Sequence, residues 1–249
     1  MKRIYLDRND CDISQKDICV RGDTFHYLKK VLRMKAGDVF AGFDGTGSEY
    51  TIEARNVENG LLEGVIIELK KVINTETSFN LQLFQSIPKS GKMDLIISET
   101  AQLGVKKIVP VISSRVIGSL PAEREARKRE RWAKIAAEAS RISGRGSVME
   151  ISEVMKFKDA VEMNSDLSIF FWERAAIPLR HIIERASLPA ADAVIKIFVG
   201  PEGGYTEEEA ALAEHCGALT ASIGKRILKV ETASVIATAL TIYELENRK

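Results

Sequence analysis

The stretch IFVGPEGGYTEEE, residues 197–209, leads from an apolar run into an acidic one through a turn that contains three glycines. The apolar run has the composition of a buried strand, and Thr206 followed by Glu209 fits the capping box that begins a helix. An ordinary strand-to-helix turn needs at most one glycine, so the additional glycines indicate that a ligand lies against the backbone. Taken alone, the loop is equally compatible with an elaborate capped turn that binds nothing.

A second glycine turn, SIGKRILKVETAS at residues 222–234, also follows an apolar run and precedes a helical pattern. Ligands of open α/β sheets bind beyond the carboxyl ends of the strands, so two such loops on neighbouring strands would form the walls of a slot. Neither loop has the Gly-Lys-Ser/Thr of a phosphate-binding loop, which makes a nucleoside triphosphate a weak candidate. The pair favours a flat ligand, such as an adenine ring, held by main-chain N–H and C=O groups.

From about residue 75 onward, apolar runs of strand length alternate with helical patterns. Strands are expected at 79–87, 106–112, 167–172, 194–199 and 219–223, and helices at 89–104, 123–140 and 232–246. This alternation predicts an α/β domain with a mostly parallel sheet and helices on its faces. The last helix is apolar around most of its circumference, which predicts burial on more than one side, within the domain or against a second subunit.

Residues 1–72 have a different pattern, that of a β-rich module with one short helix. Apolar residues recur at helical spacing in 23–38 up to Gly37, and the turns DGTG (44–47) and ENG (58–60) separate apolar runs as in β-hairpins. The change of pattern near INTET, residues 73–77, predicts a domain boundary. We therefore expect one domain over 1–72 and a second over 75–249.

The composition excludes several classes of protein. The 249 residues are 45% hydrophobic, and 36 basic and 35 acidic side chains leave a formal charge of +1, so an anionic partner must meet a local patch. Three cysteines and three histidines are too few and too scattered for a disulfide framework or a metal site, and we expect reduced cysteines, a cytoplasmic location and no metal. The first residues, MKRIYLDRND, are charged where a signal peptide is apolar, and no apolar window approaches the length of a membrane span.

Several segments together resemble one known family over essentially the whole chain. GPEGGYTEEE (200–209), IGKRILKVETA (223–233) and KMDLIISETAQLGVKKIVPV (92–111) resemble the signature segments of the ribosomal RNA small-subunit methyltransferase E family. HYLKKVLRMKAGD (26–38) resembles the family's N-terminal PUA-like RNA-binding barrel domain, and Ser-Gly-Arg at 143–145 resembles its central motif. The chain departs from the family pattern at Arg141 and Ile142, where relatives usually carry Glu-Gln, and at Met149, where a proline is expected.

The resemblance implies a fold, a cofactor, a reaction and a partner. The fold is that of the SPOUT class, a parallel sheet with a trefoil knot, and the cofactor is S-adenosylmethionine. The reaction is methylation of N3 of one uridine in 16S ribosomal RNA, either free or in the assembled small subunit. The family also implies a homodimer.

The resemblance further implies the site residues. The cofactor would lie against three loops, which comprise Trp172, Glu173, Gly200, Pro201, Glu202, Gly203, Gly204, Ile223, Gly224, Ile227 and Leu228. Arg145 would stabilise charge on the uracil oxygens, or else contact a phosphate or form a surface ion pair. Glu231 would accept the N3 proton, or else only favour the N-terminus of the last helix. Glu202 would orient ribose hydroxyls or brace its own loop.

Local positive charge marks the expected RNA contacts. Between Arg115 and Arg145 there are nine Lys/Arg against four Glu, and basic residues also gather near His26. The candidate RNA-binding residues are His26, Arg33, Lys89, Lys92, Arg115, Arg131 and Arg145. Two rival functions remain open, a SPOUT enzyme that methylates a ribose 2′-hydroxyl and an RNA-binding ribosome-assembly factor without chemistry. The first rival typically carries an Asn-x-Gly arginine motif early in its catalytic domain, and we find no such string here.

Overall fold

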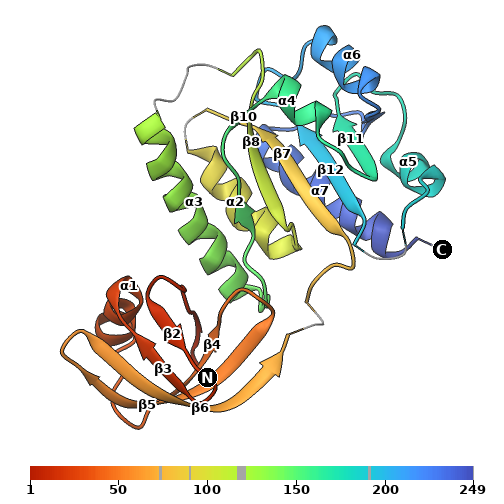
Figure 1. Cartoon of the computed structure of the whole chain (residues 1–249). Coiled ribbons are helices and arrows are strands. Elements are labelled where there is room, and N and C mark those ends of the chain that lie inside the picture. The colour runs from red at the N-terminus through yellow and green to blue at the C-terminus, as the bar shows by residue number, and fades with distance from the viewer. Residues whose placement is uncertain (73–74, 90, 117–121, 190–191, 249) are drawn as a thin grey trace. The chain divides into compact units, whose positions relative to one another are not determined.

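The computed structural model describes residues 1–72, 75–89, 91–116, 122–189 and 192–248 (Figure 1). The chain divides into two compact units. Unit 1 contains Met1–Glu76 and Ser140–Val148, and unit 2 contains Thr77–Ala139 and Met149–Lys249. The expected boundary at 73–77 lies partly outside the described residues, since 73 and 74 are not among them.

One segment differs from the expected division, because 140–148 belongs to unit 1 and not to the domain predicted over 75–249. The reason is hydrogen bonding over long sequence distances. The Arg3 guanidinium donates to the carbonyl oxygens of Ser140, Arg141 and Arg145, at 3.3, 3.2 and 2.6 Å. The N–H of Gly47 also donates to the carbonyl of Gly146 at 3.0 Å.

In the described part of unit 1, six strands form a mixed sheet in the order β1-β4-β5-β6-β3-β2. The strands are β1 (Arg3–Tyr5), β2 (Cys11–Ile13), β3 (Asp17–Val20), β4 (Val39–Phe43), β5 (Ser48–Glu58) and β6 (Leu61–Lys71). The predicted helical segment is α1 (Gly22–His26) followed by a π-helical turn η1 (Tyr27–Val31). Both predicted hairpins are confirmed, since β4 pairs with β5 and β5 with β6 in antiparallel register.

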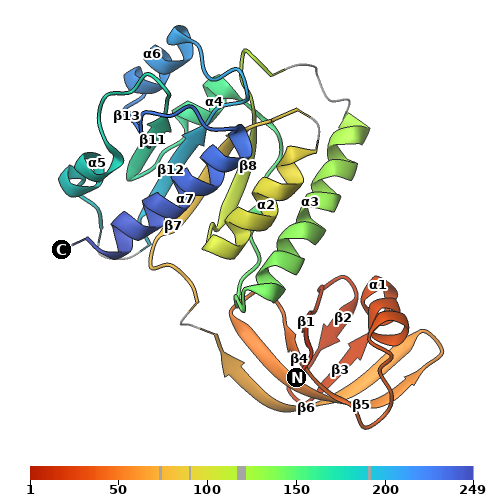
Figure 2. The same cartoon turned by 180° about the vertical axis from the view of Figure 1, so that it is seen from behind.

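The barrel expected for this unit is not closed by hydrogen bonding. The edge strands β1 and β2 are three residues long, and among the described pairings neither is bonded to the other. The turn between them, residues 6–10, instead makes local bonds such as that from the Asp10 N–H to the Asp7 carbonyl at 3.0 Å. The unit is therefore an open, strongly curved sheet around an apolar core (Figure 2).

Unit 2 is the predicted α/β domain, and every pairing described between its strands is parallel. The order is β10-β8-β7-β12-β11-β13, with β9 also paired to β8. The strands are β7 (Asn80–Ser86), β8 (Lys107–Ile112), β9 (Glu150–Ile151), β10 (Met155–Lys156), β11 (Leu167–Phe171), β12 (Val194–Val199) and β13 (Leu219–Ala221). The helices are α2 (Lys92–Leu103), α3 (Ala122–Ile142), α4 (Phe157–Glu162), α5 (Leu179–Arg185), α6 (Glu207–His215) and α7 (Val230–Glu246), and the last residues of α3 belong to unit 1.

The helices of unit 2 cover both faces of its sheet, as the alternation of the sequence predicts (Figures 1 and 2). On one face, α4 and α6 pack over Phe84, Phe170 and Phe198, and the rings of Phe84 and Phe198 stack with centroids 4.7 Å apart. On the other face, α2 and α7 lie side by side. None of the helices in the described ranges is long and apolar enough to cross a membrane.

One charged residue interrupts the apolar strand β12. Lys196 is 1% exposed, and its Nζ donates to the carbonyl oxygens of Ala160 and Val161, at 3.4 and 3.3 Å, and to that of Met163. These carbonyls end α4, where the negative end of the helix dipole favours a cation. Burial nevertheless lowers the pKa of Lys196 from 10.5 to about 8, because desolvation disfavours the charged form.

This lysine predicts a pH dependence of stability. Between about pH 8 and 10, the unfolded chain binds the Lys196 proton more tightly than the folded chain does, so the free energy of unfolding gains a contribution that rises with pH. The Lys196→Met variant has no ionisable group at this position, so it lacks this contribution. Urea unfolding at pH 7.5, 9 and 10 should therefore show the wild type gaining stability relative to Lys196→Met as pH rises, and a constant difference would contradict the assignment.

Candidate functional site

The carboxyl ends of the parallel strands bring five chain segments to one edge of the unit 2 sheet. Trp172 and Glu173 follow β11, the loop 200–206 follows β12, and the segment 222–229 joins β13 to α7. The segments after β7 and β8 complete the edge, at residues 87–89 and 113–115. Both predicted glycine loops therefore lie at the edge where ligands of such sheets bind.

The first glycine loop is closely surrounded by side chains. Gly204 has φ +67°, and a Cβ added to it would lie 2.7 Å from a carboxylate oxygen of Glu173. A Cβ on Gly203 would lie 3.2 Å from Cδ of Arg115, whose guanidinium donates to the Gly203 carbonyl. These approaches explain why side chains are missing from this turn.

The capping box predicted after this loop is confirmed, and its glutamate has a second role. The Thr206 hydroxyl accepts from the Glu209 N–H at 3.2 Å, and Glu209 Oε2 accepts from the Thr206 N–H at 2.9 Å. The other oxygen, Oε1, accepts from the N–H and hydroxyl of Ser114, at 2.7 and 3.0 Å. Glu209 is only 6% exposed. Its hydrogen bonds to Ser114 fix the segment after β8, and the next residue in that segment is Arg115, which contacts the glycine loop. The sequence pattern gave a signal only for the capping.

A charged cluster joins three of the loops, and we call Lys92, Glu202 and Glu231 the clasp. Lys92 Nζ lies 3.0 Å from Glu202 Oε1 and 3.4 Å from Glu231 Oε2. The backbone N–H of Lys89 also donates to both oxygens of Glu202, at 3.1 and 3.2 Å. Glu202 therefore braces its loop against the β7–α2 loop, which is one of its two predicted roles.

The clasp shifts the pKa of each of its members toward the charged form. The pKa of Lys92 is raised, chiefly by its hydrogen bond to Glu202. Partial burial acts to raise the pKa of Glu202, but hydrogen bonds from its own N–H, Lys92 and Lys89 lower it overall. The pKa of Glu231 is lowered by its own backbone N–H, which belongs to the first turn of α7, and by the charge of Lys92.

Three buried polar atoms at this edge have no hydrogen-bond partner in the described part of the chain, and one of them is Ser113 Oγ in the segment after β8. The other two are Trp172 Nε1 and Glu231 Oε2, although Oε2 is within ion-pairing distance of Lys92. Such atoms are rare in folded proteins unless a ligand or water meets them. The edge thus offers one donor and one carboxylate acceptor to an occupant.

The second glycine loop makes local hydrogen bonds, and a buried polar pair lies near the first loop. Gly224 has φ +131° and its N–H donates to the Ser222 hydroxyl at 3.2 Å, while the Ile227 side chain is 89% exposed. In that pair, the buried Gln85 accepts from the Ser234 hydroxyl at 2.5 Å, and it donates to the Val199 carbonyl at 3.4 Å. Sequence reasoning missed Gln85, because a polar residue within an apolar run carries no sign of the neighbour it meets.

Arg145, predicted to act in catalysis and RNA binding, belongs to unit 1, whereas Glu231 belongs to unit 2. The Arg145 side chain is 2% exposed and lies 2.9 Å from Glu76 Oε2. It also donates to the Ser147 hydroxyl at 3.0 Å, and Glu76 accepts from the Ser147 N–H at 3.2 Å. The guanidinium therefore holds the segment 140–148 within unit 1, and its contact with a substrate stays a prediction.

The other predicted RNA-binding residues are distributed over both units. His26 and Arg33 are exposed in unit 1, and Lys89, Arg115 and Arg131 are exposed in unit 2. Some basic side chains of α3 are engaged by carboxylates, as in Arg131 with Asp94 at 2.5 Å, Arg129 with Glu153 at 3.0 Å and Lys134 with Glu130 at 3.2 Å. The positive charge available on α3 is therefore smaller than its composition indicates.

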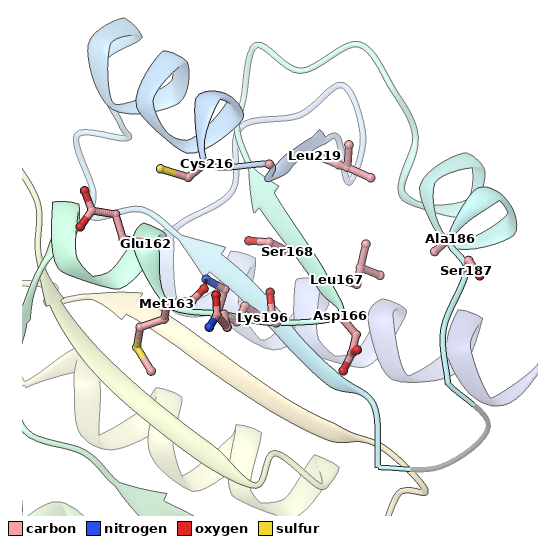
Figure 3. A pocket seen from close by; sticks show the side chains of 13 residues that line it. Glu162, Met163, Asp166, Leu167, Ser168, Ala186, Ser187, Lys196, Cys216 and Leu219 are labelled. Carbon is pink, nitrogen blue, oxygen red and sulfur yellow. Dashed lines mark hydrogen bonds between the residues drawn. The ribbon is translucent and has the colours of Figure 1, made fainter.

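A separate cavity of about 590 Å³ lies at the opposite edge of the sheet, at the amino ends of β11 and β12 (Figure 3). Asp166, Leu167, Lys196 and Cys216 are among its lining residues. The ammonium of Lys196 is already engaged by the carbonyls that end α4. We therefore assign the functional site to the glycine loops and not to this cavity, since ligands of parallel sheets bind at the carboxyl edge.

Family models match two parts of the chain. A model described as an RNA methyltransferase domain covers residues 75–242, and one described as an RNA methyltransferase PUA domain covers residues 20–53. The chain is also 30% identical to the ribosomal RNA small subunit methyltransferase E of Buchnera aphidicola, over 96% of its own length and 92% of that relative.

Two similar structures were solved with a cofactor. A ribosomal RNA small subunit methyltransferase E from Neisseria gonorrhoeae, bound to S-adenosyl methionine, matches with a TM-score of 0.83 and 30% identity over 96% of each chain. A putative methyltransferase from Legionella pneumophila, in complex with the cofactor SAM, matches with a TM-score of 0.85 and 25% identity over 96% of each chain. The described fold is thus shared over nearly the whole length of both.

The double role of Glu209 can be tested by substitution. Glu209→Ala should lower the free energy of unfolding by about 1–3 kcal/mol, because the N–H groups of Ser114 and Thr206 lose the buried carboxylate that accepts from them. Glu208→Ala, in the same helical turn but exposed, is the matched control and should change stability much less. Equal losses in urea unfolding would contradict the role of Glu209.

Proposed function

Because the chain belongs to the ribosomal RNA small subunit methyltransferase E family, we propose that it transfers a methyl group from S-adenosylmethionine to N3 of one uridine in 16S ribosomal RNA. The observation that carries the proposal is the carboxylate of Glu231 beside the glycine loops, whose buried Oε2 has no hydrogen-bond partner among the described residues and lies 3.4 Å from Lys92 Nζ. Uracil N3 bears a hydrogen that must leave when the methyl group is added, and Glu231 offers an acceptor for it.

The residues at the carboxyl edge fit the proposed cofactor. The loops 200–204 and 223–228 offer main-chain groups at this edge, where the Arg115 and Glu173 side chains approach Gly203 and Gly204, and Trp172 Nε1 is a buried donor without a hydrogen-bond partner among the described residues. These loops would hold the adenosine part of the cofactor, with Glu173 beside Gly204. When bound, S-adenosylmethionine supplies a methyl group that is already activated by its sulfonium. The protein then mainly has to hold the reacting groups in line and manage one proton.

Glu231 is placed to manage that proton. Its lowered pKa keeps the carboxylate ionised at neutral pH, so it is ready to accept the N3–H hydrogen bond. A carboxylate is a weak base toward neutral uracil, but the N3 proton becomes more acidic as N3 forms its new bond. Glu231 then takes the proton and passes it to solvent. The uridine has to be unpaired or extruded, because N3 lies on its Watson–Crick edge.

Arg145 remains our proposed stabiliser of charge on the uracil oxygens. In this structure its guanidinium is engaged by Glu76, so contact with the base requires that ion pair to rearrange or to be shared. Unit 1, part of which matches the PUA domain model, and the exposed basic residues would bind the RNA around the target. Membership of the family also supports a trefoil knot in unit 2.

We further propose that the enzyme is a homodimer, and α7 supports this. Its predicted all-round burial is incomplete within one chain, since Ile236, Leu240 and Tyr243 are 38%, 37% and 58% exposed. These side chains recur at helical spacing, and Leu95 of the adjacent helix α2 is 50% exposed. An apolar strip of this kind suits an interface between two copies.

Cofactor binding can be tested at Gly203. Gly203→Val should raise the dissociation constant for S-adenosylmethionine at least tenfold in calorimetry, because its side chain would enter the space that the backbone exposes. The fold should survive, since the added Cβ meets only the flexible Arg115 side chain. Ala211→Val, on the exposed side of α6, is the control and should bind as the wild type does. No binding to a folded wild type would favour the assembly-factor alternative.

The role of Glu231 predicts a separation of binding from catalysis. Glu231→Gln keeps the shape and one acceptor oxygen but cannot take a proton, so methyl transfer to ribosomal RNA should fall about 100-fold or more. Affinity for the cofactor should fall by about tenfold or less, because Glu231→Gln also weakens the contact with Lys92, so the loss of activity should exceed the loss of affinity. Tritium transfer from labelled cofactor, with the modified base identified by mass spectrometry, measures the rate, and a methylated ribose would support the 2′-hydroxyl alternative. Full activity of Glu231→Gln would contradict the proposed role.

A further inference from the structure

Lys92 occupies a position that local electrostatics disfavours. It is the first residue of α2, next to Gly91, which has φ +69° and supplies no side-chain cap. The positive end of a helix dipole repels a cation there. The location therefore calls for a compensating partner elsewhere in the fold.

The compensation comes from two carboxylates that lie far from Lys92 in the sequence. Glu202 belongs to the glycine loop after β12, and Glu231 is the second residue of α7. The ammonium lies 3.0 Å from the first and 3.4 Å from the second. The Lys92 ammonium, at the start of α2, thus links the two loops that form the walls of the proposed slot.

The clasp is partly shielded from solvent. The side chains of Lys92, Glu202 and Glu231 are 33%, 25% and 20% exposed. Fully exposed pairs are screened by water and contribute little, whereas partly covered charges interact more strongly. Without the Lys92 ammonium, the carboxylates of Glu202 and Glu231 would repel each other, and Glu231 Oε2 would lose its ion-pair partner.

We propose that Lys92 is a positioning residue of the cofactor slot, which holds the loop of Glu202 and the start of α7 together and so sets the spacing of the slot walls. This inference rests on the proposed function for the identity of the ligand, but the clasp itself exists without a ligand. Lys92 acts through Glu202 and Glu231 and need not touch the cofactor. Its ammonium is engaged within the protein by Glu202 and Glu231, and its contact with RNA stays a prediction.

The first experiment measures the loops of the ligand-free protein by hydrogen–deuterium exchange. In full-length Lys92→Met, the segments 200–204 and 223–231 should both exchange faster, about threefold or more, although neither contains residue 92. Lys107→Met is the matched control, because Lys107 also pairs with a glutamate, Glu150 at 2.8 Å, and its side chain is 27% exposed at the other edge of the sheet. Unchanged exchange in both segments of Lys92→Met would overturn the proposal.

The second experiment measures cofactor affinity by calorimetry. Lys92→Met should raise the dissociation constant for S-adenosylmethionine about tenfold, Lys92→Arg should restore most of the affinity, and Lys107→Met should leave it unchanged. In a double-mutant cycle, Glu202→Gln should cost much less in the Lys92→Met background than in the wild type, because both changes remove the same link.

The outcomes separate this inference from the proposed function. Wild-type affinity in Lys92→Met, or additive losses in the cycle, would overturn the role of Lys92 while leaving the methyltransferase proposal in place. Failure of the folded wild type to bind S-adenosylmethionine would overturn the cofactor assignment, and the exchange experiment would still decide whether Lys92 holds the two walls. Similar affinity losses in Lys92→Met and Lys92→Arg would also count against positioning by charge.

Discussion

The parallel hydrogen bonding of β12 between β7 and β11 is the interaction on which the site depends. Because parallel strands point the same way, the chain leaves each of them at the same edge of the sheet. Lys92 and Glu202 stand far apart in the sequence and meet because they follow the neighbouring strands β7 and β12, and Glu231 reaches Lys92 because α7 packs beside α2. An antiparallel arrangement of the same segments would place their loops at opposite edges.

The site combines glycine loops with a buried polar pair. The glycines of the first loop let Arg115 and Glu173 approach the backbone closely, and the hydrogen bond between Ser234 and Gln85 satisfies polar groups that would otherwise be costly to bury. Glu209 fixes the neighbouring segment after β8 by accepting hydrogen bonds from Ser114. Loops that are rich in glycine would be entropically costly to order, and these fixed contacts hold them in one conformation.

Two lysines show that local electrostatic interactions, and not the net charge, decide where a charged side chain can lie in this nearly neutral chain. Lys196 lies at the C-terminal end of α4, where the carbonyl groups accept its hydrogen bonds, and it can be buried within an apolar strand. Lys92 lies at the N-terminal end of α2, where the helix opposes it and two carboxylates compensate. Neither role follows from the overall charge of +1.

The sequence by itself determined the strands β7, β8, β11, β12 and β13, the helices α2, α3 and α7, the short helix and two hairpin turns of unit 1, the capping box at Thr206 and the place of the glycine loops. These features depend on periodicity, turn residues and caps, which act over a few neighbouring positions. Tertiary structure alone decided that residues 140–148 join unit 1, that Glu76 buries the charge of Arg145, that Glu209 fixes Ser114 and that Lys92 bridges two acidic residues. The physical reason is that these contacts join positions tens to more than a hundred residues apart, and no local pattern specifies which of many possible partners the fold brings within hydrogen-bonding distance.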